Sequence, residues 1–157
     1  MSDLMSDAPI SLSAWEHKIS CAHSKVMDLG LTRVRQVASE LGVLKPAAKV
    51  ITLAGTNGKG TTANLLNRLL SGINKKVGVY TSPHLLKINE RFRINNFLVA
   101  DDLLAQAFSK VDEASKKLKV SLTYFEYCCL ASFWLFKQQK CDVWVLEVGL
   151  GGRLDAI

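Results

Sequence analysis

Residues 51–66 read ITLAGTNGKGTTANLL, and this stretch decides how the chain folds. A short β-branched segment is followed by closely spaced glycines around one lysine and then by a run of helix-forming residues. A strand that enters a glycine turn and leaves it as a helix directs several backbone N–H groups at one point, and the positive end of the helix dipole adds to them. The stretch is therefore typical of a phosphate-binding loop.

The spelling of this loop differs from the common P-loop motif. That motif has Ser or Thr directly after Gly-Lys, whereas here Gly60 separates Lys59 from Thr61 and Thr62. Lys59 can neutralise nucleotide phosphates and either threonine hydroxyl can reach Mg²⁺, so we expect the additional glycine only to lengthen the turn. The alternative is an ordinary strand-to-helix turn, but five matched positions arise by chance with a probability below about 10⁻³ over such a chain.

Strands and helices alternate along the rest of the sequence. Besides the strand at residues 49–55, KVGVYTS at 76–82 and CDVWVLEVG at 141–149 are apolar runs that predict buried strands. Helices are predicted, from apolar periodicity and capping residues, at 11–20, 31–42, 61–72, 99–118 and 123–140, the last opening with a capping box from Thr123 to Glu126. This order indicates an α/β fold, a P-loop-containing parallel sheet with helices on both faces. Residues 1–12 are expected to form a flexible tail.

Composition and charge restrict the class of protein. The 157 residues are 48% hydrophobic and 22% charged, no apolar run is long enough to span a bilayer, and the N-terminus does not resemble a secretion signal, so we expect a cytoplasmic protein. The net charge of +6 is spread out, and its densest group, SKKLK at 115–119, lies beside Asp112 and Glu113, which favours a solvated helix face over a nucleic-acid surface. The four cysteines lack zinc-like spacing and are interpreted as small, at least half-buried hydrophobic residues.

Two polar residues end predicted strands. Glu147 comes at the carboxyl end of the third strand, where open α/β sheets bind ligands, so it is a candidate metal ligand; the alternative is an acid that faces solvent. Ser82 ends the second strand, and its alternative is a helix cap with Pro83 at the first helical position. A nicotinamide enzyme is disfavoured because Leu154 breaks the dinucleotide fingerprint, and a GTPase because no NKxD segment is present.

Four motifs, taken in order, carry a family resemblance. They are AGTNGKGTT at 54–62, KVGVYTSPHLLKINERFRIN at 76–95, SLTYFEY at 121–127 and CDVWVLEVGLGGRLDA at 141–156. From about Trp15 onward the chain resembles the Mur ligase family of ATP-dependent amide ligases, in particular its dihydrofolate synthase/folylpolyglutamate synthase members. The loop with the additional glycine is this family's own form.

The resemblance implies a fold and a reaction. Residues 13–157 would form the N-terminal portion of the Mur-ligase-type ATP-binding domain, incomplete and without the C-terminal glutamate-ligase domain. ATP would phosphorylate the carboxylate of dihydropteroate or a folate, and L-glutamate would then attack the acyl phosphate, with Mg²⁺ as cofactor. These small molecules would be its partners, with no nucleic acid or membrane, and the full-length protein would be a monomer. The chain alone is expected to be inactive, and a non-catalytic nucleotide-binding module or a degenerate gene remnant remains an alternative.

The resemblance also assigns residues. ATP phosphates would be bound by Thr56, Asn57, Gly58, Lys59, Gly60 and Thr61, with Lys59 as the catalytic residue. Mg²⁺ would be bound by Ser82 and Glu147. The pterin-bearing substrate would be lined by Asp28, Leu29, Gly30 and Leu31, by Thr123, Tyr124, Phe125 and Glu126, and by Leu154, Asp155 and Ala156. Phe125 is the residue expected to stack on a flat pterin.

Overall fold

A mixed five-stranded sheet between two helical layers forms the protein. The computed structural model describes residues 10–21, 30–152 and 155–157. Its helices are α1 (Leu12–Cys21), α2 (Thr32–Glu40), α3 (Lys59–Gly72), the 3₁₀ helix η1 (Ile88–Arg91), α4 (Asp101–Leu118) and α5 (Tyr124–Gln138). Its strands are β1 (Lys49–Leu53), β2 (Val77–Tyr80), β3 (Phe92–Ile94), β4 (Phe97–Leu98) and β5 (Val143–Glu147). All five predicted α-helices and the three predicted strands are present.

The sheet has the strand order β1-β5-β2-β3-β4. β5 pairs in parallel with β1 on one side and with β2 on the other, so the carboxyl ends of the three predicted strands lie at one edge. The predicted parallel sheet is formed by β1, β5 and β2, and β3 and β4 add an antiparallel hairpin beside β2 that the sequence did not predict. Asn95 occupies the turn of this hairpin with φ 53°, a conformation that Asn tolerates better than most residues.

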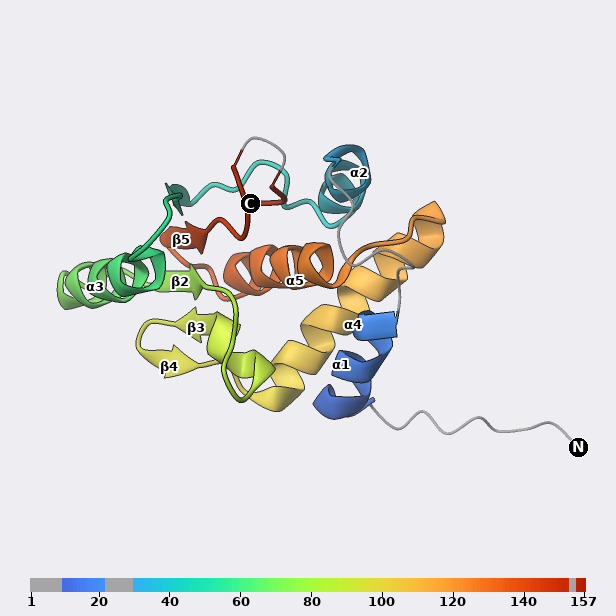
Figure 1. The fold of residues 1–157 in the computed structure, drawn as a ribbon, viewed down its shortest axis with the longest axis horizontal. Helices are drawn as coiled ribbons and strands as arrows, with labels where there is room; N and C mark the ends of the chain where they lie inside the picture. The colour runs from blue at the N-terminus through green and yellow to red at the C-terminus, as the bar shows by residue number, and fades with distance from the viewer. Residues whose placement is uncertain (1–9, 22–29, 153–154) are drawn as a thin grey trace, which may run out of the picture.

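Helices cover both faces of the sheet, as predicted. On one face α3 packs against β1, β2 and β5, where Ala63 contacts valines from β2 and β5. On the other face α5 lies against β2, and α4 with α1 and α2 form a further layer over α5. Figure 1 shows α3 at one end of the molecule, with α5, α4 and α1 following one another on the opposite side of the strands.

The sheet divides the buried apolar side chains into two clusters, one on each face, and successive residues of a strand belong to different clusters. In β2, Val77 and Val79 face α3, whereas Tyr80 packs in the core on the side of α5. β5 divides in the same way, with Val145 toward α3 and Trp144 toward α5. Because side chains alternate along a strand, these fully apolar runs are buried on both faces.

Several smaller predictions can also be compared with the structure. Lys116 pairs with Asp112 (2.9 Å) and Lys117 with Glu40 (2.6 Å), so the lysine-rich segment is a solvated helix face, as predicted. Of the four cysteines, three are buried but Cys21 is exposed, which corrects the prediction for that residue. Residues 1–9 of the expected tail lie outside the described residues, and α1 begins at Leu12. No helix among the described residues is long and apolar enough to cross a membrane.

Gly78 in β2 provides a test of how closely α5 packs on the sheet. A β-carbon at this position would overlap the ring of Phe136, whereas one at Gly72, at the end of α3, would meet nothing within 4 Å. We expect Gly78→Ala to lower the free energy of unfolding by about 1–3 kcal/mol, because overpacking a filled core forces the ring or the backbone to move.

Gly72→Ala is the matched control for this prediction. It should raise the free energy of unfolding slightly, since Ala favours a helix over Gly by up to about 1 kcal/mol. Urea denaturation of both variants measures the difference. Equal effects of the two substitutions would contradict the close packing of Phe136 on β2.

Candidate functional site

The loop between β1 and α3 has the geometry of an anion-binding turn. Gly58 is the N-cap of α3 and has φ 77°, in the left-handed region that favours glycine. α3 begins at Lys59, so Gly60 lies in the first helical turn, and the expectation that it only lengthens the turn is wrong. The first N–H groups of a helix have no partner within the helix, and they open here toward the loop. The segment can therefore bind phosphate oxygens.

Lys59 and the two threonines take different roles around this turn. The Lys59 ammonium donates a hydrogen bond to the Gly55 carbonyl oxygen at 2.8 Å, which keeps the positive charge over the loop. The hydroxyl of Thr62 donates to the Gly58 carbonyl oxygen at 2.9 Å. Both threonines are exposed, but only the Thr62 hydroxyl is engaged with the loop, so the structure favours Thr61 as the hydroxyl available to a ligand.

Glu147 lies next to this loop and is buried. Its side chain is only 5% exposed, which rules out the alternative of an acid that faces solvent. The Glu147 carboxylate accepts a hydrogen bond from the Ser82 backbone N–H at 3.2 Å, and a β-carbon at Gly60 would lie 3.8 Å from the same oxygen. Glycine at position 60 therefore keeps side-chain atoms away from the carboxylate.

Ser82 follows β2 and does not cap a helix. The Ser82–Pro83 peptide bond is cis, and the next helix, η1, begins only at Ile88, so the helix-cap alternative is wrong. The serine is half-buried beside Glu147. The ends of the adjacent parallel strands β2 and β5 thus bring together a hydroxyl and a carboxylate at the start of α3.

These groups fit a hard divalent cation. Mg²⁺ prefers carboxylate, hydroxyl, phosphate and water oxygens and is usually bound by one or two protein ligands together with substrate phosphates. No group of three or more His, Cys, Asp or Glu side chains suited to a metal occurs in the described part of the chain. A cation held by Ser82 and Glu147 would accordingly need further oxygens from a nucleotide and from water.

Phe125 and Asp155, two of the residues expected to line the organic substrate, lie at the turn after β5. Phe125 is half-buried in the first turn of α5, and its ring lies so close to Gly149 that a β-carbon there would be 2.7 Å away. Asp155 is buried and accepts hydrogen bonds from the N–H groups of Gly149 (3.1 Å), Leu150 (2.9 Å) and Ile157 (3.0 Å). Phe125 and Asp155 therefore meet at the turn after β5, and the half-buried Ala156 follows directly.

Thr123 and Glu126 are both engaged in local structure. The Thr123 hydroxyl accepts from the Glu126 N–H at 3.3 Å and the Glu126 carboxylate accepts from the Thr123 N–H at 2.7 Å, which confirms the predicted capping box. Glu126 also accepts from Arg33 of α2 at 3.0 Å, a partly buried ion pair. This pair links the start of α2, just after Gly30 and Leu31, to the start of α5.

Three of the predicted substrate residues lie outside the described part of the chain. They are Asp28, Leu29 and Leu154. Their proposed contact with the substrate remains a prediction from the resemblance.

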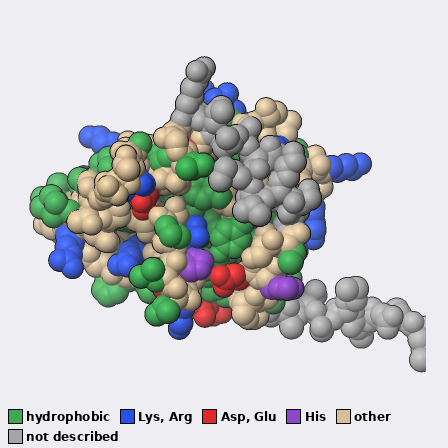
Figure 2. Space-filling model, viewed as in Figure 1, with side chains coloured by type: hydrophobic (Ala, Val, Ile, Leu, Met, Phe, Trp, Pro, Cys, Tyr) green, Lys and Arg blue, Asp and Glu red, His purple; other side chains and the backbone are tan. Residues whose placement is uncertain are grey.

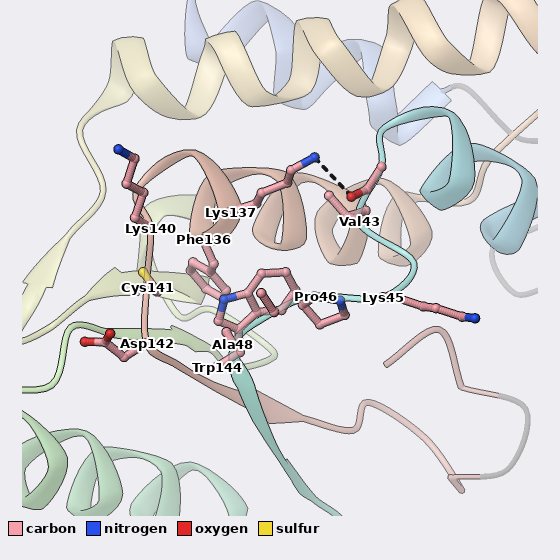
Figure 3. A pocket seen from close by; sticks show the side chains of 12 residues that line it. Val43, Lys45, Pro46, Ala48, Phe136, Lys137, Lys140, Cys141, Asp142 and Trp144 are labelled. Atoms are coloured by element: carbon pink, nitrogen blue, oxygen red, sulfur yellow. Dashed lines mark hydrogen bonds between the residues drawn. The ribbon is translucent and has the colours of Figure 1, made fainter.

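A cavity lies at the other end of the parallel strands, away from the loop beside Glu147. This cavity of about 510 Å³ is lined by residues of the α2–β1 connection and the end of α5, with Phe136 and Trp144 in its wall (Figure 3). Lys137 donates to the Gly42 carbonyl oxygen at 3.0 Å, and Lys45 and Lys140 extend away from the cavity. Since its cations do not converge, this hollow is a weaker candidate than the loop beside Glu147.

The turn after Ser82 depends on Glu90, a residue for which the sequence predicted no role. The Glu90 carboxylate accepts hydrogen bonds from the N–H groups of Leu85, Leu86 and Lys87, each at 2.8 Å. These bonds, the one from Leu85 foremost, favour the charged form and lower the pKa of Glu90 from 4.5 to about 2.

Glu90 therefore gives a prediction about pH. Because its pKa is lower in the folded state, its stabilisation of the turn is complete above about pH 4.5 and is lost as the pH falls through about 2. An NMR titration of the Glu90 carboxyl carbon should show a midpoint near 2. In Glu90→Gln the amide resonances of residues 85–87 should shift at neutral pH. A carboxyl midpoint near 4.5 would contradict the three hydrogen bonds.

Comparisons with known proteins agree with this geometry. No family model matches the chain. The dihydrofolate synthase/folylpolyglutamate synthase of Escherichia coli is 50% identical over 145 residues, which cover 92% of this chain and 34% of that protein. The protein of the same name from Haemophilus influenzae is 47% identical over 156 residues, covering 99% and 35%. The chain thus spans about a third of the length of these relatives.

Solved structures show the same fold. E. coli FolC in complex with DHPP and ADP matches with a TM-score of 0.89 and 50% identity, over 93% of this chain and 35% of that one. The bifunctional enzyme solved with Mn, AMPPNP and L-glutamate matches with a TM-score of 0.86 and 48% identity, over 93% and 35%. The folylpolyglutamate synthase of Mycobacterium tuberculosis complexed with ADP has a TM-score of 0.84 at 28% identity, over 92% and 33%. By sequence and by fold, the chain is similar to a part of these dihydrofolate synthase/folylpolyglutamate synthases that makes up about a third of their length.

Proposed function

We propose that this chain carries the nucleotide- and metal-binding part of an ATP-dependent ligase that joins L-glutamate to dihydropteroate or to folates. The observation that carries the proposal is the position of the buried Glu147 carboxylate, bonded to the Ser82 N–H and adjacent to Gly60 of the phosphate-binding turn. Relatives with which the chain shares up to 50% identity are named for these two activities.

The reaction proposed for the whole protein has two steps. A carboxylate oxygen of the pterin-bearing substrate attacks the γ-phosphorus of ATP, and ADP leaves. The amine of L-glutamate then attacks the acyl carbon, which forms the amide and releases phosphate. Little covalent chemistry is required of the protein, so positioning and charge neutralisation carry the catalysis.

The described residues would serve the first step. N–H groups from Thr56 to Thr61 would bind the phosphate oxygens, and the Lys59 ammonium would offset the charge that develops on the transferred group. Ser82 and Glu147 would hold Mg²⁺, which neutralises the phosphates and orients them. The half-buried position of Phe125 against Gly149 supports its role as a stacking surface for the pterin ring.

The remaining predicted substrate residues form the rest of this proposal. Residues 28–31, 123–126 and 154–156 would enclose the flat heterocycle, with Thr123 and Glu126 also fixing the start of α5. The partners would be ATP, the pterin-bearing acid and L-glutamate, in a cytoplasmic protein that is monomeric at full length. The glutamate site would belong to the parts of the relatives that this chain does not match.

A binding module without ligase activity is the second candidate function. It is favoured because the described residues already contain the phosphate-binding turn and the buried Glu147 carboxylate beside it. This candidate would use the same turn and the same cation ligands.

Lys59→Ala tests the nucleotide site. Removing the ammonium should weaken Mg-ATP binding by at least about tenfold, since a charge-assisted contact contributes roughly 1.5–3 kcal/mol. Lys75→Ala is the control, because Lys75 is exposed just beyond the other end of α3. Isothermal titration calorimetry of the two variants and the wild type measures the affinities. Equal affinity in all three proteins would contradict the phosphate-binding role.

Incorporation of labelled glutamate separates the two candidate functions. With ATP, Mg²⁺ and dihydropteroate present, glutamate incorporation by the chain would establish ligation. Mg-ATP binding without incorporation would support the binding module. A folded chain that binds no nucleotide would overturn both candidates.

A further inference from the structure

Arg91 forms the centre of a polar cluster that the proposed function leaves unused. It is the last residue of η1 and is half-buried. Its Nε donates a hydrogen bond to His84 Nδ1 at 2.8 Å, and its guanidinium carbon lies 5.3 Å from the centre of the Tyr124 ring. The cluster therefore combines a cation with an aromatic face, an arrangement that orients the planar guanidinium.

No described carboxylate forms an ion pair with Arg91, unlike Lys18, Arg33 and Lys117, which each have one. Glu16 of α1 approaches only through the histidine, since His84 Nε2 lies 3.8 Å from a Glu16 carboxylate oxygen. Because His84 Nδ1 accepts from Arg91, the ring proton is on Nε2, the nitrogen toward Glu16. The imidazole thus keeps the acid away from the guanidinium.

Two buried tyrosine hydroxyl groups lie beside Arg91, whose positive charge acts on both. The side-chain oxygens of Tyr80 and Tyr124 are buried and have no hydrogen-bond partner among the described residues. Burial raises the pKa of both phenols, so each keeps its proton and can donate. Buried polar groups are normally paired, and a half-buried cation without an anion is costly. The cluster is suited to an oxygen-bearing ligand.

The cluster adjoins the proposed substrate site. The Arg91 carbonyl oxygen accepts from the Thr81 N–H at 3.1 Å, one residue before Ser82. Tyr124 directly precedes Phe125, and the rings of Tyr80 and Phe125 have centroids 6.2 Å apart. Figure 2 shows a hollow with apolar side chains in the middle of this face, with basic, histidine and acidic side chains at its margin.

We propose that Arg91 is a substrate-binding residue whose guanidinium donates hydrogen bonds to an oxygen of the acid that stacks on Phe125. The inference rests on the proposed function and extends it. A planar fork of N–H donors matches a carboxylate or a ring oxo group. The ligand class is therefore a flat aromatic heterocycle that carries such an oxygen, and His84 and Tyr124 fix the direction of the donors.

Fluorescence titration of the 157-residue chain with pteroate tests this proposal. Arg91→Ala should weaken pteroate binding by at least about tenfold, with Mg-ATP affinity unchanged. Arg91→Lys keeps the charge but loses the fork, and should be intermediate. Arg93→Ala is the matched control, because Phe92 points into the core and Arg93 lies on the opposite face of β3. Thermal melting identifies any variant that fails to fold.

Two smaller ligands identify the oxygen that Arg91 binds. 6-Methylpterin has the ring oxo group without the benzoate, and 4-aminobenzoate has the carboxylate without the ring. An Arg91→Ala effect confined to the first ligand assigns the ring oxygen, and one confined to the second assigns the carboxylate. Unchanged pteroate affinity in folded Arg91→Ala would overturn the inference alone. Failure of the wild type to bind pteroate would instead overturn the proposed substrate, and the inference with it.

Discussion

The hydrogen bond from the Ser82 N–H to the Glu147 carboxylate joins the ends of two neighbouring parallel strands, and the geometry of the site depends on it. The register of β2 and β5 brings these ends together, with Tyr80 opposite Leu146. A buried carboxylate is costly unless it is hydrogen-bonded or meets a cation. Here one backbone N–H satisfies part of that requirement, and the adjoining turn with Lys59 supplies the setting for a nucleotide and its metal ion.

Most of the fold could be predicted from the sequence because its signals are local. β-branched runs marked the three parallel strands, and Thr123 with Glu126 marked the start of α5 through a capping box that forms as expected. The hairpin of β3 and β4 was not predicted, because these strands have only three and two residues. Its turn residue Asn95 was the available signal, a residue type that is tolerant of positive φ.

Residues for the candidate site could be proposed from the sequence, but their contacts could not. A Ser-Pro pair has the same local pattern whether or not a helix follows, so only the tertiary structure could decide against a cap at Ser82. Likewise, Asp155 could be associated with the substrate by resemblance, but its hydrogen bonds to the turn after β5 depend on the folded chain. Arg91 lies within the motif at residues 76–95, but no role could be assigned to it from the sequence, since its distinguishing property is the lack of a described acidic partner.

The most direct measurement of the central claim is a crystal structure of this chain with Mn²⁺ and AMPPNP, using the anomalous signal of manganese to locate the ion. The account predicts one anomalous peak between the Ser82 hydroxyl and the Glu147 carboxylate, at oxygen-ligand distance from both, with the nucleotide phosphates over residues 56–61. A nucleotide bound in the turn with manganese elsewhere would contradict the metal site. A nucleotide bound away from the turn would contradict the account as a whole.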